Sequence, residues 1–567
     1  MTGQRNIGTT LLGISIGFLI LLYVLPISNL ALLSLAEGGR AYREFFAMEA
    51  SIPILVNTFL FSAEVTFFSL VLGYPVACVA LTASPRWRAV ILLISTVPLW
   101  TSLLVRTYAW LALLGRNGVI NQTLQSVGLI DSPLDLSRNS FGAMVSSVYI
   151  MLPLMVLTLY AAMRQIDMNT IKAARTLGAR RSQAFLAVFV PLSKPGIVSA
   201  CLLVFIISLG FFVTPALLGG PSDRTFSMLI AQQINRLADF AAASAQSIFF
   251  LGISIAMLLV FAGTIGFDQF IGGRLRQQGR SWLAASPLVD HLPLLAPLLR
   301  ILESRLLWNL VVGLVLLWLL SPFLVIIQLS LSAADYLQFP VQEWSLRWYE
   351  ELVATRQWRA AGLNSLVVAA IASALALGIG LTAALGLREV RGSVGRFALV
   401  ILLAPALLPS MIYSIGAYLA AAKLGWADSR TALALAHSTL GLPFVIIILT
   451  TALGSLDPNL ERAARSLGAG RWASLRFVTV PLLLPALISA AIIAFQTSFD
   501  EVVVSLFLSG VRTRTIPRLM WQSATMEVDP AVMAVAVVVL ATVLIAALLG
   551  YLAVRLVPGM RRQAAAR

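Results

Sequence analysis

Residues 462–485 read RAARSLGAGRWASLRFVTVPLLLP, and residues 172–195 read KAARTLGARRSQAFLAVFVPLSKP. Both stretches begin polar and basic and end apolar. A shift of 290 residues aligns them without a gap, and 14 of the 29 positions in 167–195 are identical to their partners. Hydrophobic composition alone would not hold Asp, Asn, Gly and Pro at fixed spacing. The chain therefore contains an internal repeat.

The repeat extends upstream with a changed register. There a shift of 307 residues pairs Pro98 with Pro405, so the first half is longer by 17 residues between its third and fourth apolar segments. We predict a first half at 1–268, a cytoplasmic linker at 269–303 and a second half at 304–567. The Gly, Arg and Pro content of the linker is typical of a loop.

The composition is that of a membrane protein. Of the 567 residues, 59% are hydrophobic and 11% are charged, and runs of about 20 apolar residues are long enough to cross a bilayer. We predict an all-α, polytopic protein with two parallel, pseudo-symmetric halves of six spans each. The predicted spans are 10–34, 55–83, 88–114, 140–163, 196–220, 245–268, 304–332, 361–387, 395–422, 431–454, 485–510 and 531–556.

The net charge of +16 is distributed in a way that disfavours nucleic-acid binding. Lys and Arg gather in alternate loops, including 164–194 and 462–476, while most acids lie in the intervening loops. This is the positive-inside pattern. It predicts a multi-pass membrane protein, with both termini and both copies of the repeated segment in the cytoplasm.

The sequence offers little for catalysis or metal binding. Cys78 and Cys201 both lie in predicted spans and indicate neither a disulfide nor a metal site. His291 and His437 are isolated, which favours structural roles. A P-loop needs Gly-Lys-Ser/Thr, and none of the three lysines follows a glycine or precedes Ser or Thr. We therefore predict no catalytic residue and no cofactor on this chain.

Each repeated segment contains Ala-Ala-Arg-x-Leu-Gly-Ala, which predicts a short amphipathic helix outside the membrane. Asp167 and Asp457, or the Asn two residues later, are suited to cap its start. Gly178 and Gly468 stand at its end, where glycine tolerates a left-handed backbone. A single such helix could simply turn the chain at the membrane surface, but two equivalent copies favour docking elements for a two-fold partner.

These segments resemble the EAA loop of bacterial ABC-importer permeases, E-A-A-x-x-x-G followed by I-x-L-P, and the resemblance covers nearly the whole chain as two fused permease domains. The first motif position holds Lys172 and Arg462 instead of Glu, with Glu461 one residue earlier. The resemblance implies coupling loops at 167–195 and 457–485. It implies a place in the bacterial inner membrane, two ATP-binding cassette subunits that carry ATP and Mg, and a periplasmic substrate-binding protein. The implied coupling residues are Ala173, Ala174, Gly178, Pro191, Ala463, Ala464, Gly468 and Pro481.

Three acids fall inside predicted spans, where ionisable side chains are costly and favour a functional role. Glu64, Asp500 and Glu501 lie eight to ten residues from the outer ends of their spans, roughly 12–15 Å deep at 1.5 Å per residue. They could line one cavity for a cationic substrate. Alternatively, they are interhelical partners of Arg106 or of a hydroxyl group. The aromatic residues that either bind a cation or only pack are Trp100, Tyr108, Trp110, Tyr413 and Tyr418.

The stretches LLVRTYAWLALLGRNGVIN, LGFFVTPALLGGP and SFDEVVVSLFLSG resemble the permeases of spermidine/putrescine importers. The resemblance implies that a small, polyamine-like solute moves from the periplasm to the cytoplasm. The alternatives are the same importer class acting on ferric iron, thiamine or an opine or amino compound. A secondary active transporter is a rival class, which would need no paired docking helices.

Overall fold

The computed structural model describes residues 2–265, 304–336, 339–390, 392–526 and 530–556, so the predicted linker lies outside the described residues. The first-half helices are α1 (Thr2–Leu19), η1 (Ile20–Val24), α2 (Leu25–Ser34), α3 (Ala36–Ala47), α4 (Ser51–Thr82), α5 (Pro85–Thr96), η2 (Val97–Trp100), α6 (Leu103–Leu114), α7 (Val119–Ser126), α8 (Ser140–Met163), α9 (Met168–Thr176), α10 (Arg181–Ala184), η3 (Phe185–Phe189), α11 (Val190–Leu209), α12 (Val213–Leu218), α13 (Phe226–Asn235) and α14 (Phe240–Ile265). The second-half helices are α17 (Arg305–Ser330), α18 (Arg347–Ala354), α19 (Arg356–Glu389), α20 (Ser393–Leu407), α21 (Ser410–Lys423), α22 (Arg430–Ser455), α23 (Pro458–Ser466), α24 (Arg471–Ser474), η5 (Leu475–Thr479), α25 (Val480–Phe499), α26 (Val503–Leu508), α27 (Ile516–Met526) and α28 (Ala531–Leu556).

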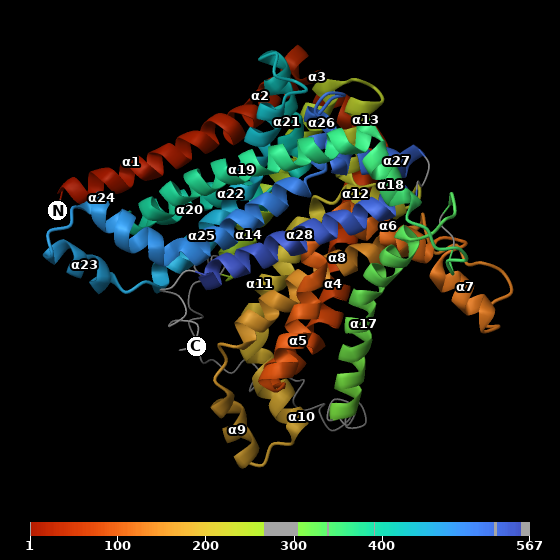
Figure 1. Ribbon diagram of the computed structural model, residues 1–567, viewed down its shortest axis with the longest axis horizontal. Helices are drawn as coiled ribbons and strands as arrows, with labels where there is room; N and C mark the ends of the chain where they lie inside the picture. Colours follow the sequence, from red (N-terminus) through yellow and green to blue (C-terminus); the bar gives the residue numbers. More distant parts are fainter. Residues whose placement is uncertain (1, 266–303, 337–338, 391, 527–529, 557–567) are drawn as a thin grey trace.

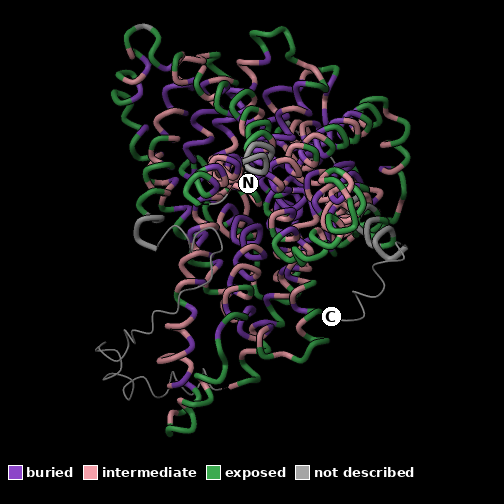
Figure 2. Tube along the Cα trace, turned by 90° about the vertical axis from the view of Figure 1, so that its left-hand side faces the viewer, coloured by how far each residue is buried: buried purple, intermediate pink, exposed green. Residues whose placement is uncertain are grey.

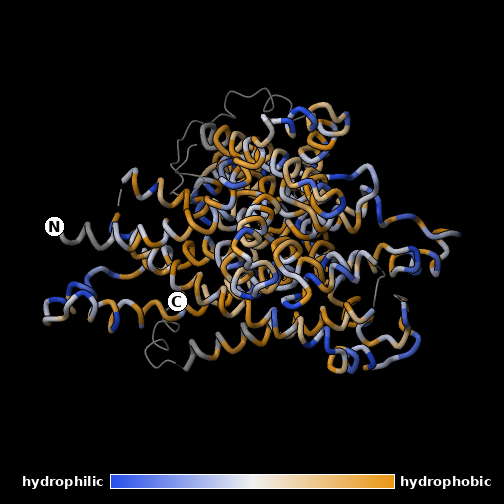
Figure 3. Tube along the Cα trace, turned by 90° about the horizontal axis from the view of Figure 1, so that it is seen from above, coloured by the Kyte–Doolittle hydropathy of each residue, from blue (hydrophilic) through white to orange (hydrophobic). Residues whose placement is uncertain are grey.

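The prediction of an all-α, polytopic protein is confirmed. Nine helices in the described part of the chain are long and apolar enough to cross a membrane, or eleven if each of two bent pairs is one span. The twelfth predicted span, 531–556, coincides with α28. Buried residues concentrate in the middle of the molecule (Figure 2). Hydrophobic residues occupy the same region, and hydrophilic residues gather toward the two ends (Figure 3).

Each of the predicted spans 88–114 and 395–422 is a pair of helices with a sharp bend between them. The segment α5–η2 meets α6–α7 at 99°, and α20 meets α21 at 92°. In the second half, Leu408 has an extended backbone directly before Pro409, because a proline ring disfavours the helical conformation of the residue before it. Thr101 is extended at the equivalent position of the first half without a following proline.

The predicted spans 196–220 and 485–510 are displaced along the chain. The observed helices are Arg181–Leu209 and Arg471–Phe499. Each therefore takes in the polar stretch after the motif glycine and ends well before the predicted boundary. The short helices α12 and α26 follow after a break. Asp500, which was expected inside a span, consequently stands at the end of α25.

A π-helical turn, η3 or η5, interrupts these two spans at the same register. In the first half the N–H of Val190 bonds to the carbonyl of Phe185, five residues back, and Val480 bonds to Leu475 in the second half. A proline follows directly in both halves, and its ring nitrogen carries no N–H to continue the helical pattern. The turn joins the repeated polar segment to the rest of the span.

The first helices of each half pack on the other half. α1 lies along α19 (Figure 1), α2 lies along α21, and α17 lies against α4, α5 and α6. The hydroxyl of Tyr149 on α8 donates to the carbonyl of Leu319 on α17 at 3.1 Å. A glycine permits the close approach of α1, because a Cβ atom at Gly386 would lie 2.9 Å from the backbone nitrogen of Leu12. The two halves are therefore interlocked.

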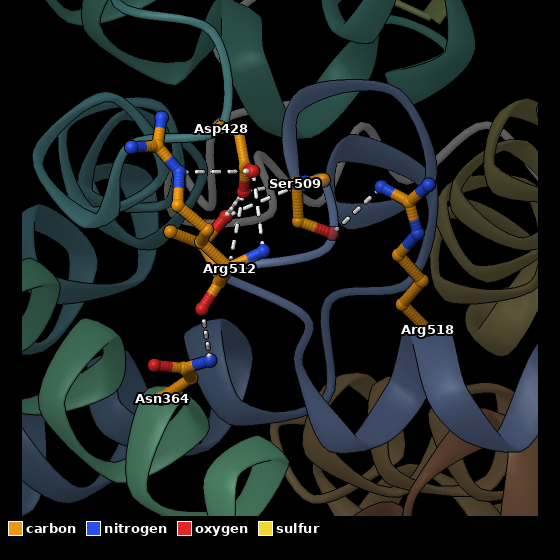
Figure 4. A network of polar contacts seen from close by, with 7 residues as sticks. Asn364, Asp428, Ser509, Arg512 and Arg518 are labelled. Atoms are coloured by element: carbon orange, nitrogen blue, oxygen red, sulfur yellow. Dashed lines mark hydrogen bonds and ion pairs between the residues drawn. The ribbon is translucent and has the colours of Figure 1, made fainter. Parts of the chain in front are cut away.

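One acid fixes the loop that follows α26. Asp428 accepts hydrogen bonds from the N–H groups of Gly510 at 2.8 Å and Arg512 at 3.1 Å. It also accepts from the N–H of Thr513 at 2.9 Å and from its hydroxyl at 2.6 Å (Figure 4). Partial burial opposes the charge, but these donors lower the pKa of Asp428 to about 2. Asn364 on α19 holds the same loop by donating to the Arg512 carbonyl at 3.1 Å.

We expect Gly386→Val to weaken the packing of α1 on α19. The added side chain would meet backbone atoms of α1, and overpacking of this kind costs about 1–3 kcal/mol. Gly378→Val is the matched control, because the same helix offers open space there. Thermal unfolding in detergent should show a lower midpoint for the Gly386 variant alone, and equal midpoints would contradict the interlocked packing.

We expect Asp428→Asn to lower the free energy of unfolding by about 1–3 kcal/mol, because it leaves loop donors poorly paired. A depressed pKa contributes stability that is present above the unfolded pKa and is lost as the pH falls through about 2. The deficit should therefore be the same at pH 5 and pH 8 in thermal unfolding. Asp131→Asn, at an exposed loop acid, is the control, and a deficit that vanishes at pH 5 would contradict this assignment.

Candidate functional site

Two short helices, α9 and α23, stand at the ends of two separate groups of helices (Figure 1). None of their residues is buried. The Asp167 side chain accepts the N–H of Asn169 at 2.9 Å, and the Asp457 side chain accepts the N–H of Asn459 at 2.9 Å. The predicted caps are confirmed. We call α9 and α23 the docking helices.

Both docking helices end at the predicted glycines. The φ angle is +94° at Gly178 and +87° at Gly468, which is the left-handed region that favours glycine. The residues before them, Leu177 and Leu467, are 88% and 89% exposed. Single exposed leucines are common on proteins, but here the same residue protrudes at equivalent positions of two repeats. Each helix thus presents an apolar side chain to solvent.

The two docking helices have the same burial pattern, position by position. Their outward positions are Lys172, Ala173, Arg462 and Ala463, and all four are exposed. Ala174 and Ala464 are half-buried on the inner side. Pro191 and Pro481 lie beyond the docking helices, at the second residue after each π-helical turn. The predicted coupling residues therefore divide into an outward surface and a connection to the span.

Glu461 attaches α23 to the body of the second half. Its Oε1 accepts a hydrogen bond from the Arg388 guanidinium of α19 at 2.6 Å. The same oxygen accepts from the Thr479 hydroxyl of η5 at 2.7 Å. Partial burial opposes the charge, but Thr479 and Arg388 lower the pKa of Glu461. In the sequence, Glu461 was notable only because it lies one residue before the position that Glu occupies in the EAA motif.

A second candidate site lies where breaks in spans of the two halves meet. The N–H of Leu103, at the start of α6, donates to both carboxylate oxygens of Asp500, at 2.8 and 3.1 Å. The equivalent contact between the other two breaks involves no charge. There a Cβ atom at Gly210 would lie only 3.3 Å from the Cα of Pro409. The Asp500–Gly210 difference makes the site asymmetric.

Neighbouring side chains make further polar contacts around the break at Asp500. Gln496 donates to the carbonyl of Leu99 at 2.6 Å, and Glu501 accepts an N–H from the first turn of α26 at 3.0 Å. Arg106, which is 7% exposed on α6, places a positive charge near Asp500. Asp500 thus has a partner in the opposite half, as the interhelical alternative expected, whereas Glu501 bonds to backbone only three residues further along the chain. A contact with substrate stays a prediction.

Glu64 has different surroundings from Asp500. It is exposed on α4, on the same helical face as Leu60 and Phe68, which are 58% and 45% exposed. An ionised carboxylate is costly against hydrocarbon. A contact of Glu64 with substrate stays a prediction.

The predicted aromatic residues serve chiefly as packing groups. Tyr108 and Tyr413 are each 1% exposed, and their hydroxyls donate to backbone carbonyls at 2.8 and 3.3 Å. Trp110 is 2% exposed, Tyr418 stacks on a phenylalanine ring, and Trp100 is half-buried. Any contact of Trp100, Tyr108 or Tyr413 with substrate remains a prediction.

Two buried polar residues refine the sequence-based description. His437 on α22 lies 2.9 Å from the hydroxyl oxygen of Ser498 and 3.4 Å from that of Ser505, so it bridges both sides of the break. This agrees with the predicted structural role, whereas His291 lies outside the described residues. Gln496 was missed. The signal for it was a polar residue in an apolar span, opposite Ile206 in the repeat.

Comparison with known proteins places this geometry in context. The sequence matches the family model of the binding-protein-dependent transport system inner membrane component over residues 13–277 and 376–562. It is 30% identical over 261 residues to the spermidine/putrescine transport system permease protein PotB of Haemophilus influenzae, covering 44% of this chain and 90% of that protein. It is 35% identical over 209 residues to the putrescine transport system permease protein PotI of Escherichia coli, covering 35% of this chain and 74% of that protein.

Among solved structures, one similar chain comes from a bacterial alginate ABC transporter in complex with an alginate pentasaccharide-bound periplasmic protein. It is 21% identical with a TM-score of 0.40, and the match covers 46% of this chain and 94% of that chain. The family model matches once in each half, as the internal repeat predicts, and each match contains one docking helix. The chain belongs to the binding-protein-dependent transport system inner membrane components, as an ABC-importer permease with two fused permease domains.

Proposed function

We propose that this chain forms the membrane pathway of an ATP-driven importer for a small, cationic, polyamine-like solute. The observation that carries the ATP-driven part is the pair of docking helices, with equal caps, equal glycine ends and equally exposed leucines. One ATP-binding subunit covers each helix and supplies ATP and Mg. A periplasmic binding protein delivers the solute, which moves to the cytoplasm.

The route from a docking helix to the pathway is short in both halves. Each docking helix leads through a π-helical turn into a spanning helix. That helix ends at a break, near Gly210 or Asp500, which touches the opposite half. Closure of the ATP-binding subunits displaces the docking helices, and the spanning helices carry this displacement to the contacts between halves. Access to the pathway then alternates between the two sides of the membrane.

The orientation follows from charge. The docking segments carry the basic runs 164–194 and 462–476, and such runs favour the cytoplasmic side. Both termini lie on that side in this proposal, and the inner membrane separates the docking helices from the binding protein. The ATP-binding subunits then act from the compartment that contains ATP.

The substrate class rests on charge and on relatives. The names of two similar permeases include spermidine or putrescine, and Glu64 offers an exposed carboxylate on a spanning helix. Ferric iron, thiamine and opines or other amino compounds are the competing substrates, and uptake competition separates them. A secondary transporter would respond to an ion gradient instead of ATP.

We expect Gly468→Val to lower ATP-dependent uptake by about tenfold, since a β-branched residue at φ +87° is strained by about 1–3 kcal/mol. Gly470→Val is the matched control, because this glycine has a φ of −64° and open space around it. Uptake is measured in proteoliposomes and divided by the amount of assembled complex. Normal uptake by the Gly468 variant would remove this turn from the coupling route.

We expect Glu64→Gln to reduce uptake of labelled spermidine by about tenfold, or about 1.4 kcal/mol. A unit charge pair about 4 Å apart gains roughly 4 kcal/mol at an effective dielectric near 20, and desolvation offsets much of this gain. Glu49→Gln, outside the spans and exposed, is the control. Asp500→Asn should instead lower the yield of folded protein, because Asp500 holds Leu103. Parental spermidine uptake by the Glu64 variant would exclude this carboxylate from the pathway.

A further inference from the structure

The two docking helices are alike on their outer surface and different on their inner surface. In the second half, Glu461 connects α23 to Arg388 on α19 and to Thr479 in η5. We call these three residues the polar clamp. The Glu461 side chain is 21% exposed and the Arg388 side chain is 28% exposed, and Thr479 is 1% exposed. The clamp is therefore partly shielded from water, which strengthens a charge-assisted hydrogen bond.

The repeat provides an internal comparison for all three positions. The 290-residue shift places Ile171 opposite Glu461 and Phe189 opposite Thr479, and the 307-residue shift places Leu81 opposite Arg388. Phe189 is buried in the apolar core, and the other two pack against that core. Each member of the polar clamp thus has an apolar counterpart. The first-half docking helix is held by apolar packing in this region.

These two attachments respond differently to a pull on the docking helix. Hydrogen bonds to a charged group depend on direction and weaken quickly when the atoms are displaced. Apolar contacts are non-directional, so one surface can slide on another at small cost. The polar clamp also reaches two elements at once, because Arg388 lies in the last turn of α19 and Thr479 ends the π-helical turn. α19 in turn packs on α1, α22 and α25.

We propose that Glu461 is a positioning residue for the transport reaction, which links movement of α23 firmly to α19 and to the π-helical turn. The two docking helices then transmit movement unequally, because α23 is attached more rigidly to its half than α9 is. This inference rests on the proposed docking of ATP-binding subunits. It concerns how α23 transmits their movement, and it assigns Glu461 a partner inside the chain.

The test uses the complete transporter, purified with its ATP-binding subunits and binding protein and reconstituted in proteoliposomes. The measured quantity is solute taken up per ATP hydrolysed. We expect Glu461→Gln and Arg388→Gln each to lower this ratio by about tenfold, which corresponds to about 1.4 kcal/mol, while ATP hydrolysis continues. The double variant should lose less than the product of the two single losses, because both changes break the same Glu461–Arg388 bond. The charge-reversed pair Glu461→Arg with Arg388→Glu should recover part of the ratio.

Two controls make the outcome specific. Glu389→Gln removes an equal charge from an exposed neighbour of Arg388 and should leave the ratio unchanged. Ile171→Ala changes the equivalent position of the first half and should cost less than Glu461→Gln. A normal ratio in Glu461→Gln, with only a lower folded yield, would overturn the proposal in favour of a purely structural role. An equal loss in Ile171→Ala would overturn the unequal transmission.

The unmodified complex separates this proposal from the proposed function. If it shows no ATP-dependent uptake, the importer assignment fails and the clamp loses its role with it. If it transports normally and the Glu461 and Arg388 variants keep the parental ratio, only the clamp proposal fails.

Discussion

The hydrogen bonds between the Leu103 N–H and the Asp500 carboxylate meet a constraint that governs the whole architecture. A break in a spanning helix exposes backbone donors and acceptors, and hydrocarbon offers them no water. The chain satisfies the break at Thr101 and Ser102 with side chains from the opposite half, Asp500 for the Leu103 donor and Gln496 for the Leu99 acceptor. Broken spans are thus tolerated because they face protein. The same requirement ties the two halves together at their breaks.

Local signals in the sequence were sufficient for the docking helices. Asp167 and Gly178 each act on a few neighbouring residues, so the cap and the left-handed end were predictable. The bends were not predictable, because a run of apolar residues indicates a span whether its helix is straight or broken. Pro409 gave a hint of one bend, but Thr101 gave none. The partner of Asp500 lies nearly four hundred residues away in the chain, and only the folded structure reveals it.

The docking helices show how a duplicated element diverges under two different demands. Leu177 and Leu467 face outward and are the same residue with nearly the same exposure, as two copies of one partner subunit would require. Ile171 and Glu461 face the body of the protein, where each half has its own neighbours. Under the proposed function, a shared partner would constrain the outer surface, while the inner surface is free to differ because each half packs on its own neighbours. The motif glutamate, displaced by one residue, belongs to the inner surface.

The packing of α1 on the opposite half also affects the order in which contacts form during synthesis. The residues around Leu12 pack against Gly386, which the ribosome adds several hundred residues later. At about 5–20 residues per second, this interval is on the order of tens of seconds. During that time α1 is in the membrane without its partner, and the face that later packs on α19 is open to lipid or to other helices. Biogenesis therefore passes through an intermediate with the first half inserted but incompletely packed, and the second half closes it.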